Sequence, residues 1–169
     1  MLITVKFSPI DYRKVLDAIN RVSKQIVSES KYLPKKLATL YSYNVRSNLM
    51  SQKFSSGYEP LNKHYVRRKV RETGSSNFWR YRDDLYSNIT VFSFSLGDGA
   101  TYWAGGIVPG VSNSKGQDIT KYGLAVEWGN SARNLPSRPL FKPTMLLFAK
   151  NEWIRETNIS LRNIKSQWR

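Results

Sequence analysis

Few side chains in this sequence are of the types that carry catalysis, and they are scattered. There is one histidine, His64, and no cysteine, which excludes a thiolate nucleophile, a zinc–thiolate site and a disulfide. The adjacent acids Asp83 and Asp84 could hold Mg²⁺ in a nuclease, but we favour their role as acids at a helix N-terminus. Glu127 is the one acid in an apolar run, where it could act as a base; we favour an ion pair with Arg138 or with a neighbouring subunit. No P-loop, dinucleotide-binding turn or Ser-His-Asp pattern is present, so we expect no enzyme activity, no metal and no cofactor.

The dominant pattern is positive charge. With 27 Lys and Arg against 12 Asp and Glu, the net charge is +15, which predicts an anionic neighbour, although a solvated basic surface or an acidic protein partner are alternatives. Tyr65, Phe78, Trp79 and Tyr81 could stack on unpaired bases, but we favour the core or an interface for them. The densest basic run, predicted to face DNA, comprises Lys63, Arg67, Arg68, Lys69 and Arg71, with Arg80 and Arg82 beyond it.

The N-terminal third has a helical pattern. Apolar residues recur at helical spacing from Val15 to Leu49, so residues 9–53 are predicted to form two core helices or one helix kinked at Pro34. Leu2 to Phe7 is a candidate short strand, and it is too short for a secretory signal. No apolar run approaches the roughly 20 residues of a transmembrane helix, so we expect no membrane partner.

A small sheet and a C-terminal helix follow. Ile89 to Leu96 alternates as a strand, Gly97-Asp98-Gly99 can form a three-residue hairpin loop, and residues 100–108 read as the returning strand. Residues 109–120 form a small-polar loop, and residues 145–168 are helical. The prediction is one α+β domain over residues 1–169: a helical part (9–53), a sheet part (55–144) and a C-terminal helix (145–168).

Between the sheet and the last helix lies the most informative stretch. Tyr122 to Gly129 reads as a short helix that Gly129 ends by adopting the left-handed C′ conformation. Pro139 and Pro143 push the residues before them towards extended geometry, so Arg138 to Phe141 is predicted to be extended, with Pro143 in the first turn of the next helix.

This stretch resembles the tail-completion and head–tail joining proteins of tailed bacteriophages, above all the Mu-type virion morphogenesis family and related siphophage proteins. Two differences are that the chain has Pro-Leu-Phe where the family has Pro-Phe-Leu, and Thr144 where the family has Ala. The resemblance covers roughly residues 55–150. Its first motif is Tyr122, Val126, Glu127, Trp128 and Gly129, its second is Arg138, Pro139, Leu140, Phe141, Pro143 and Thr144, and an upstream part is Tyr58, Pro60, Leu61, Tyr65, Lys69, Gly74, Leu85, Asn88 and Ile89.

The resemblance implies a structural virion protein. Such a subunit forms a homo-oligomeric ring, six-membered or alternatively twelve-membered, that completes the tail and joins it to the head connector. Its partners would be the adaptor, the tail terminator or the tail tube, with DNA passing non-specifically, and its location the head–tail junction after assembly in the host cytoplasm. The basic run would face the lumen, and Tyr122, Glu127, Trp128, Gly129 and Arg138 to Phe141 would hold the fold or the ring interface. A free-standing nucleic-acid-binding module is the alternative, and a nuclease using Asp83, Asp84 and Glu127 is weaker because nothing in their spacing brings these acids together.

Overall fold

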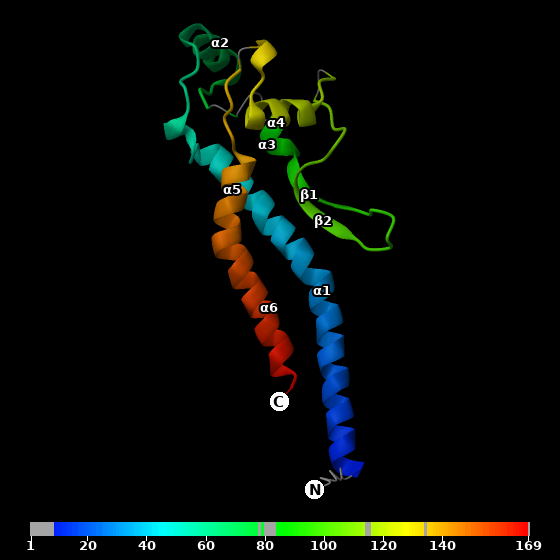
Figure 1. The fold of residues 1–169 in the computed structure, drawn as a ribbon. Coiled ribbons are helices and arrows are strands. Elements are labelled where there is room, and N and C mark those ends of the chain that lie inside the picture. Colours follow the sequence, from blue (N-terminus) through cyan, green and yellow to red (C-terminus); the bar gives the residue numbers. More distant parts are fainter. Residues whose placement is uncertain (1–8, 78, 80–83, 114–115, 134, 169) are drawn as a thin grey trace.

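The computed structural model describes residues 9–77, 79, 84–113, 116–133 and 135–168. A helix of 43 residues, about 65 Å long at 1.5 Å per residue, runs the length of the molecule, and the remaining elements gather around its C-terminal part (Figure 1). The chain is α+β, as predicted, while the strand expected over Leu2 to Phe7 lies outside the described residues. The elements in order are α1 (Pro9–Ser51), η1 (Ser55–Gly57), α2 (Lys63–Thr73), α3 (Asp84–Asn88), β1 (Ile89–Phe94), β2 (Tyr102–Ile107), α4 (Ile119–Trp128), η2 (Ser131–Arg133), α5 (Phe141–Phe148), η3 (Ala149–Trp153) and α6 (Ile154–Ser166).

The two alternatives for the N-terminal region are decided in favour of one helix. Pro34 lies inside α1 and the helix continues through it, although a proline has no N–H to bond the carbonyl of Ser30. The second half of α1 is core, since Val45 and Leu49 are fully buried. Most of the first half is not: Val22 is buried, but Val15 is 47% exposed and Ile26 48%, so the prediction of core helices is wrong for most of it.

The sheet is a two-stranded antiparallel hairpin in which Ile89 pairs with Ile107 and Phe94 with Tyr102. Its loop runs over residues 95–101, which is longer than the predicted three-residue loop. One face of the hairpin packs closely on α1. Glycine is needed at position 105 for this approach, because a Cβ there would clash with the carbonyl oxygen of Ala38 at 2.5 Å.

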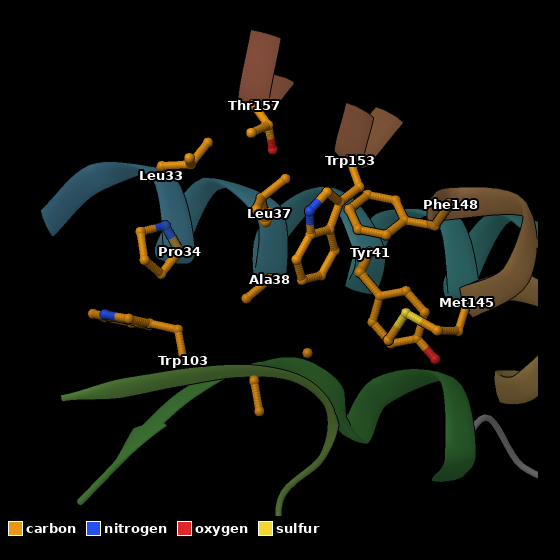
Figure 2. A pocket seen from close by; sticks show the side chains of 12 residues that line it. Leu33, Pro34, Leu37, Ala38, Tyr41, Trp103, Met145, Phe148, Trp153 and Thr157 are labelled. Carbon is orange, nitrogen blue, oxygen red and sulfur yellow. The ribbon is translucent and has the colours of Figure 1, made fainter. Parts of the chain in front are cut away.

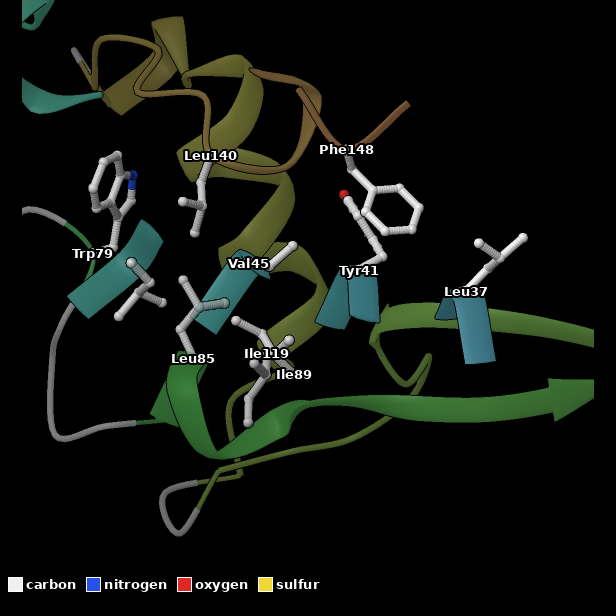
Figure 3. Packing of buried hydrophobic residues seen from close by; sticks show 10 residues of the cluster. Leu37, Tyr41, Val45, Trp79, Leu85, Ile89, Ile119, Leu140 and Phe148 are labelled. Carbon is white, nitrogen blue, oxygen red and sulfur yellow. The ribbon is translucent and has the colours of Figure 1, made fainter. Parts of the chain in front are cut away.

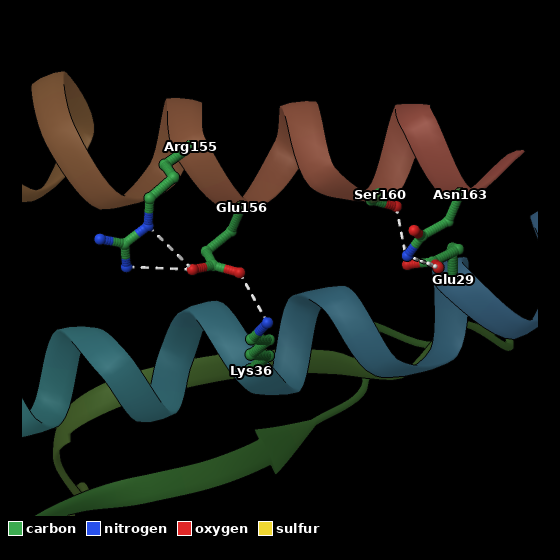
Figure 4. A network of polar contacts seen from close by, with 6 residues as sticks. All are labelled: Glu29, Lys36, Arg155, Glu156, Ser160 and Asn163. Carbon is green, nitrogen blue, oxygen red and sulfur yellow. Dashed lines mark hydrogen bonds and ion pairs between the residues drawn. The ribbon is translucent and has the colours of Figure 1, made fainter. Parts of the chain in front are cut away.

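The C-terminal helix starts earlier than predicted and is not uniform. α5 begins at Phe141, passes through the π-helical turn η3 and continues as α6. α6 packs along α1 through a polar seam (Figure 4): Lys36 Nζ lies 2.6 Å from Glu156, and Glu29 accepts hydrogen bonds from Ser160 Oγ (2.8 Å) and Asn163 Nδ2 (3.0 Å). These partners hold the pKa of both carboxyl groups below their usual range.

The hydrophobic core lies where α1, the hairpin, α4 and α5 meet (Figure 3). Residues of α1, α3, β1, α4 and α5 contribute to it, together with Trp79 and Leu140 from the connecting segments. The buried members of this cluster are Leu37, Tyr41, Val45, Leu49, Trp79, Leu85, Ile89, Ile119, Leu140 and Phe148.

Candidate functional site

The stretch that carries the family-like motif begins with α4. Asp118 caps this helix by accepting hydrogen bonds from the backbone N–H groups of Thr120 (2.8 Å) and Lys121 (3.3 Å). Gly129 ends it, as predicted, but with φ 78° and ψ 178°, so its φ is positive without being the left-handed helical conformation. A Cβ at Gly129 would lie 2.8 Å from the carbonyl oxygen of Leu135, which gives a second reason for glycine there.

The Glu127 side chain caps a different helix. Its Oε2 accepts hydrogen bonds from the backbone N–H groups of Leu140 (2.7 Å) and Phe141 (2.9 Å), and its Oε1 accepts one from that of Lys142 (2.8 Å). These groups stand at the N-terminus of α5, where backbone N–H groups have no partner within the helix, and the next residue, Pro143, has no N–H. A buried carboxylate at this position also interacts favourably with the positive end of the helix dipole.

The predicted ion pair of Glu127 is therefore wrong within the subunit. Glu127 is 6% exposed and its carboxylate is committed to three backbone groups; within the described parts of the chain it forms no ion pair with Arg138. The Arg138 guanidinium instead donates from Nη2 to the carbonyl oxygen of Glu59 (3.2 Å). A carboxylate held in this way is a structural group rather than an accessible base.

The prediction that Arg138 to Phe141 is extended is wrong at its end, because Leu140 has φ −117° and ψ −45°, in the helical region, and Phe141 begins α5. Backbone hydrogen bonds hold this segment in place. The Arg138 N–H donates to the carbonyl oxygen of Val126 (2.8 Å), and the Arg138 carbonyl oxygen accepts from Trp79 Nε1 (2.9 Å). The Tyr58 hydroxyl donates to the Pro139 carbonyl oxygen and the Tyr41 hydroxyl to that of Phe141 (3.0 Å). Burial, and then the nearby Glu127 charge, raise the pKa of both tyrosines, which keeps them protonated as donors. We call the assembly of Glu127 with residues 138–142 and these aromatic donors the clamp.

Two motif residues lie on the surface instead. Trp128 is 67% exposed and Tyr122 37% exposed, although both belong to α4. Leu140, by contrast, is fully buried in the core cluster. The motif therefore divides into residues that stabilise the fold and residues that lie at the surface.

The predicted basic run forms α2, which lies at the opposite end of the molecule from the N-terminus (Figure 1). Asn62 caps it by accepting from the His64 N–H (2.9 Å), and Gly74 ends it in the left-handed conformation. Four of the five basic side chains are exposed: Lys63, Arg67, Arg68 and Arg71.

Lys69 is the exception, and its assignment to a DNA-facing surface is wrong. It is 1% exposed, and its Nζ donates a hydrogen bond to the Asn77 carbonyl oxygen. Burial, and then the positive charge of Arg138, lower the pKa of Lys69 to about 8. Its helical spacing from Tyr65 and Thr73, four residues on either side, was the sequence signal for an inward face.

The aromatic residues and acids near this run differ in where the structure places them. Trp79 is fully buried and cannot stack on a base, whereas Phe78, Tyr81, Arg80 and Arg82 lie outside the described residues. Asp84 lies in the first turn of α3, as favoured, and accepts from Asn113 Nδ2 (3.1 Å); Asp83 is not among the described residues. Within the described ranges, no three His, Asp or Glu side chains are grouped so that they could hold a metal ion.

Comparisons with protein families, with curated proteins and with solved structures gave no match. Across the part of the chain that the structure describes, no helix combines the length and the apolar character needed to cross a bilayer.

Proposed function

We propose that this chain is a structural subunit of a tailed-bacteriophage neck, which forms a ring that completes the tail and joins it to the head connector around the DNA passage. The observation that carries the proposal is the clamp. The two halves of the family-like motif are separated along the chain, yet Glu127 of the first half bonds directly to Leu140 and Phe141 of the second. The spacing of the motif thus has a physical cause, which supports treating the resemblance as more than chance composition.

The distribution of surface chemistry supports a role in assembly rather than catalysis. Large apolar side chains are exposed on α1, α4 and α6, among them Tyr32 (69%), Trp128 (67%) and Ile154 (55%). Exposed apolar surface on this scale is typical of proteins that bind other proteins. Of the described acids that a nuclease would need, Glu127 is buried in the clamp and Asp84 lies in the first turn of α3.

The basic helix α2 fits a ring through which DNA passes. Lys63, Arg67, Arg68 and Arg71 carry charge without flanking exposed Phe, Tyr or Trp side chains among the described residues, so they favour contact with phosphate over contact with bases. Contact of this kind holds DNA without regard to sequence and releases it easily. In the proposed ring α2 faces the lumen, and the other faces meet the adaptor, the tail terminator or the tail tube in the virion.

The same helix favours one alternative function, a free-standing nucleic-acid-binding module. The two functions differ in association state and in the strength of binding at moderate salt. Light scattering after size-exclusion chromatography, with negative-stain images, gives the mass and shape of the particle. The neck proposal expects closed rings of six subunits, or of twelve, and weak duplex binding at moderate salt.

A matched pair of variants tests the role of α2. Replacing Lys63, Arg67, Arg68 and Arg71 by Gln is expected to leave the ring mass unchanged and to reduce the dependence of log K on log salt by about 3–4, since each phosphate contact contributes about 0.9. The control removes the same charge from α1, at Arg13, Lys14, Arg21 and Lys24, and should leave the slope nearly unchanged. A monomer that binds DNA tightly at moderate salt would refute the neck proposal and favour the module.

A further inference from the structure

The first turns of α1 carry an apolar stripe that the rest of the subunit leaves uncovered. We call residues 10–21 the arm; in Figure 1 it runs past the end of α6, and no other described element lies beside it. Val15 is 47% exposed, Leu16 41% and Ile19 43%. At 100° per residue these side chains share one face with Tyr12, while Arg13, Lys14 and Arg21 lie on the other. A lone helix of this length is marginal in water, so its stability depends on packing against a partner.

Further along the same face of α1, the subunit has an open apolar groove (Figure 2). Leu33, Leu37 and Tyr41 form its floor, Trp103 of β2 one wall, and Trp153 of η3 the other. Its volume is about 570 Å³, and no charged side chain is among those that line it. A cavity left by one deleted leucine side chain measures about 150 Å³, so the groove has room for roughly four side chains of that size.

We propose that the groove of one copy receives the arm of a second copy. The arm offers four side chains of suitable size: Tyr12, Val15, Leu16 and Ile19. From Tyr12 to Ile19 the arm rises about 10 Å, which is close to the roughly 12 Å between Leu33 and Tyr41 on the groove floor. A subunit cannot fill its own groove in this way, because arm and floor belong to one continuous helix.

Charge favours a second copy over an acidic partner. Copies that each carry +15 repel one another, so they associate best through surfaces that bear no charge. The stripe and the groove lining both meet this condition, whereas an acidic protein would be drawn to the opposite, basic side of the arm. An arm-to-groove contact covers both kinds of exposed apolar surface, the arm of one copy and the groove of the other. A contact between two arms would leave both grooves open.

The contact joins different surfaces on the two copies, so it is heterologous and leaves one free arm and one free groove after each addition. Such a contact closes into a ring when the rotation between copies permits, and otherwise continues as a filament. The inference deepens the proposed function and rests on it only for ring closure. The contact itself can be tested separately.

Because the chain has no cysteine, single-cysteine variants are available without background. We mix Ile19→Cys, in the arm, with Thr157→Cys, on the groove, oxidise mildly, and identify cross-linked peptides by mass spectrometry. The expected product is the 19–157 disulfide, which forms only if the two Cα atoms come within about 7 Å. Lys14→Cys, on the opposite side of the arm, is the control and should not link to 157. If Ile19→Cys links mainly to itself, the arms pair with each other and the proposal is overturned.

Self-association of the Ile19→Glu variant is measured in parallel. Burying a carboxylate in the groove should weaken assembly at least tenfold, while the thermal midpoint of the dissociated subunit stays unchanged because Ile19 lies outside its core. Lys14→Glu, which changes the charge by more, should assemble normally. Rings that persist in Ile19→Glu without the 19–157 link would overturn this inference and leave the neck proposal standing. Filaments that carry the link would support the contact and refute the ring.

Discussion

Replacement of Glu127 tests the central claim about how this chain folds. In the structure the carboxylate accepts hydrogen bonds from three backbone N–H groups at the start of α5, at 2.7, 2.9 and 2.8 Å. Glu127→Ala removes both acceptor oxygens, and with them all three hydrogen bonds, and leaves polar groups next to the core residue Leu140 without their partner. Glu127→Gln keeps the size of the side chain, but its amide oxygen can accept only part of this set while its NH₂ group faces the remaining N–H.

The expected loss in the free energy of unfolding follows from the number and kind of hydrogen bonds lost. A hydrogen bond to a charged group contributes about 1.5–3 kcal/mol, and the three bonds are not additive because the loop relaxes and water can reach Lys142. We expect Glu127→Ala to lower the free energy of unfolding by about 3–5 kcal/mol and Glu127→Gln by about 2–3 kcal/mol. Against a total of about 5–15 kcal/mol for a domain, the alanine variant approaches the limit of foldability.

The assay is urea unfolding followed by tryptophan fluorescence and far-ultraviolet circular dichroism. It is run at two protein concentrations, because self-association would make the midpoint concentration-dependent. Asp118→Ala is the matched control: this acid also caps a helix, but with two bonds, one of them at 3.3 Å, so its loss should cost only about 1 kcal/mol. If the free energy of unfolding of Glu127→Gln lies within about 0.5 kcal/mol of the wild-type value, or falls no more than that of Asp118→Ala, the clamp does not stabilise the fold as argued.

Two further substitutions test packing and buried charge. Gly105→Ala should lower the free energy of unfolding by about 2–3 kcal/mol, because its Cβ would lie 2.5 Å from a backbone oxygen; Gly57→Ala, with nothing within 4 Å of its Cβ, should be neutral, and equal urea midpoints for the two would contradict the close approach of α1. Lys69 has a folded-state pKa of about 8 against an ordinary 10.5, so the unfolded chain binds more protons between these values and wild-type stability rises with pH across that window. The stability of Lys69→Met relative to wild type should therefore fall by about 2 kcal/mol from pH 8 to pH 10.5, and a difference that is constant with pH would show that Lys69 is not desolvated.

What the sequence could predict was decided by the range of the interactions. The strand around Val91, the helix stop at Gly129 and the place of Pro143 in a first turn follow from backbone preferences, which act over a few residues, and all three are confirmed. The acceptor role of Glu127 could not be predicted, because its partners are 13 to 15 residues away and are backbone groups, which leave no trace in residue identity. Lys69 was misplaced because a net charge counts every lysine as if it were on the surface.

Helical periodicity has a related limit. Val15 and Ile19 repeat along α1 in the same way as Leu37 and Val45, so the pattern alone predicts a buried face for both halves of the helix. The sheet, α5 and α6 pack on α1, and the contacts of α6 reach back as far as Glu29, so the described elements cover mainly the second half. A periodic stripe thus shows that a helix needs a partner, but it does not show that the partner lies in the same subunit.

The exposed arm and the basic helix α2 should respond to salt in opposite directions. Copies that each carry +15 repel one another, and added salt screens the repulsion between charges farther apart than the Debye length, about 10 Å at 0.1 M, so contacts through the uncharged arm strengthen. Contacts of Arg67 and its neighbours with phosphate weaken under the same change, because releasing counterions into a more concentrated salt solution gains less entropy. A neck subunit needs both responses, since its ring must persist while DNA moves through it, and a nucleic-acid-binding module needs only the second. The sign of the salt effect on self-association therefore distinguishes the two functions on physical grounds.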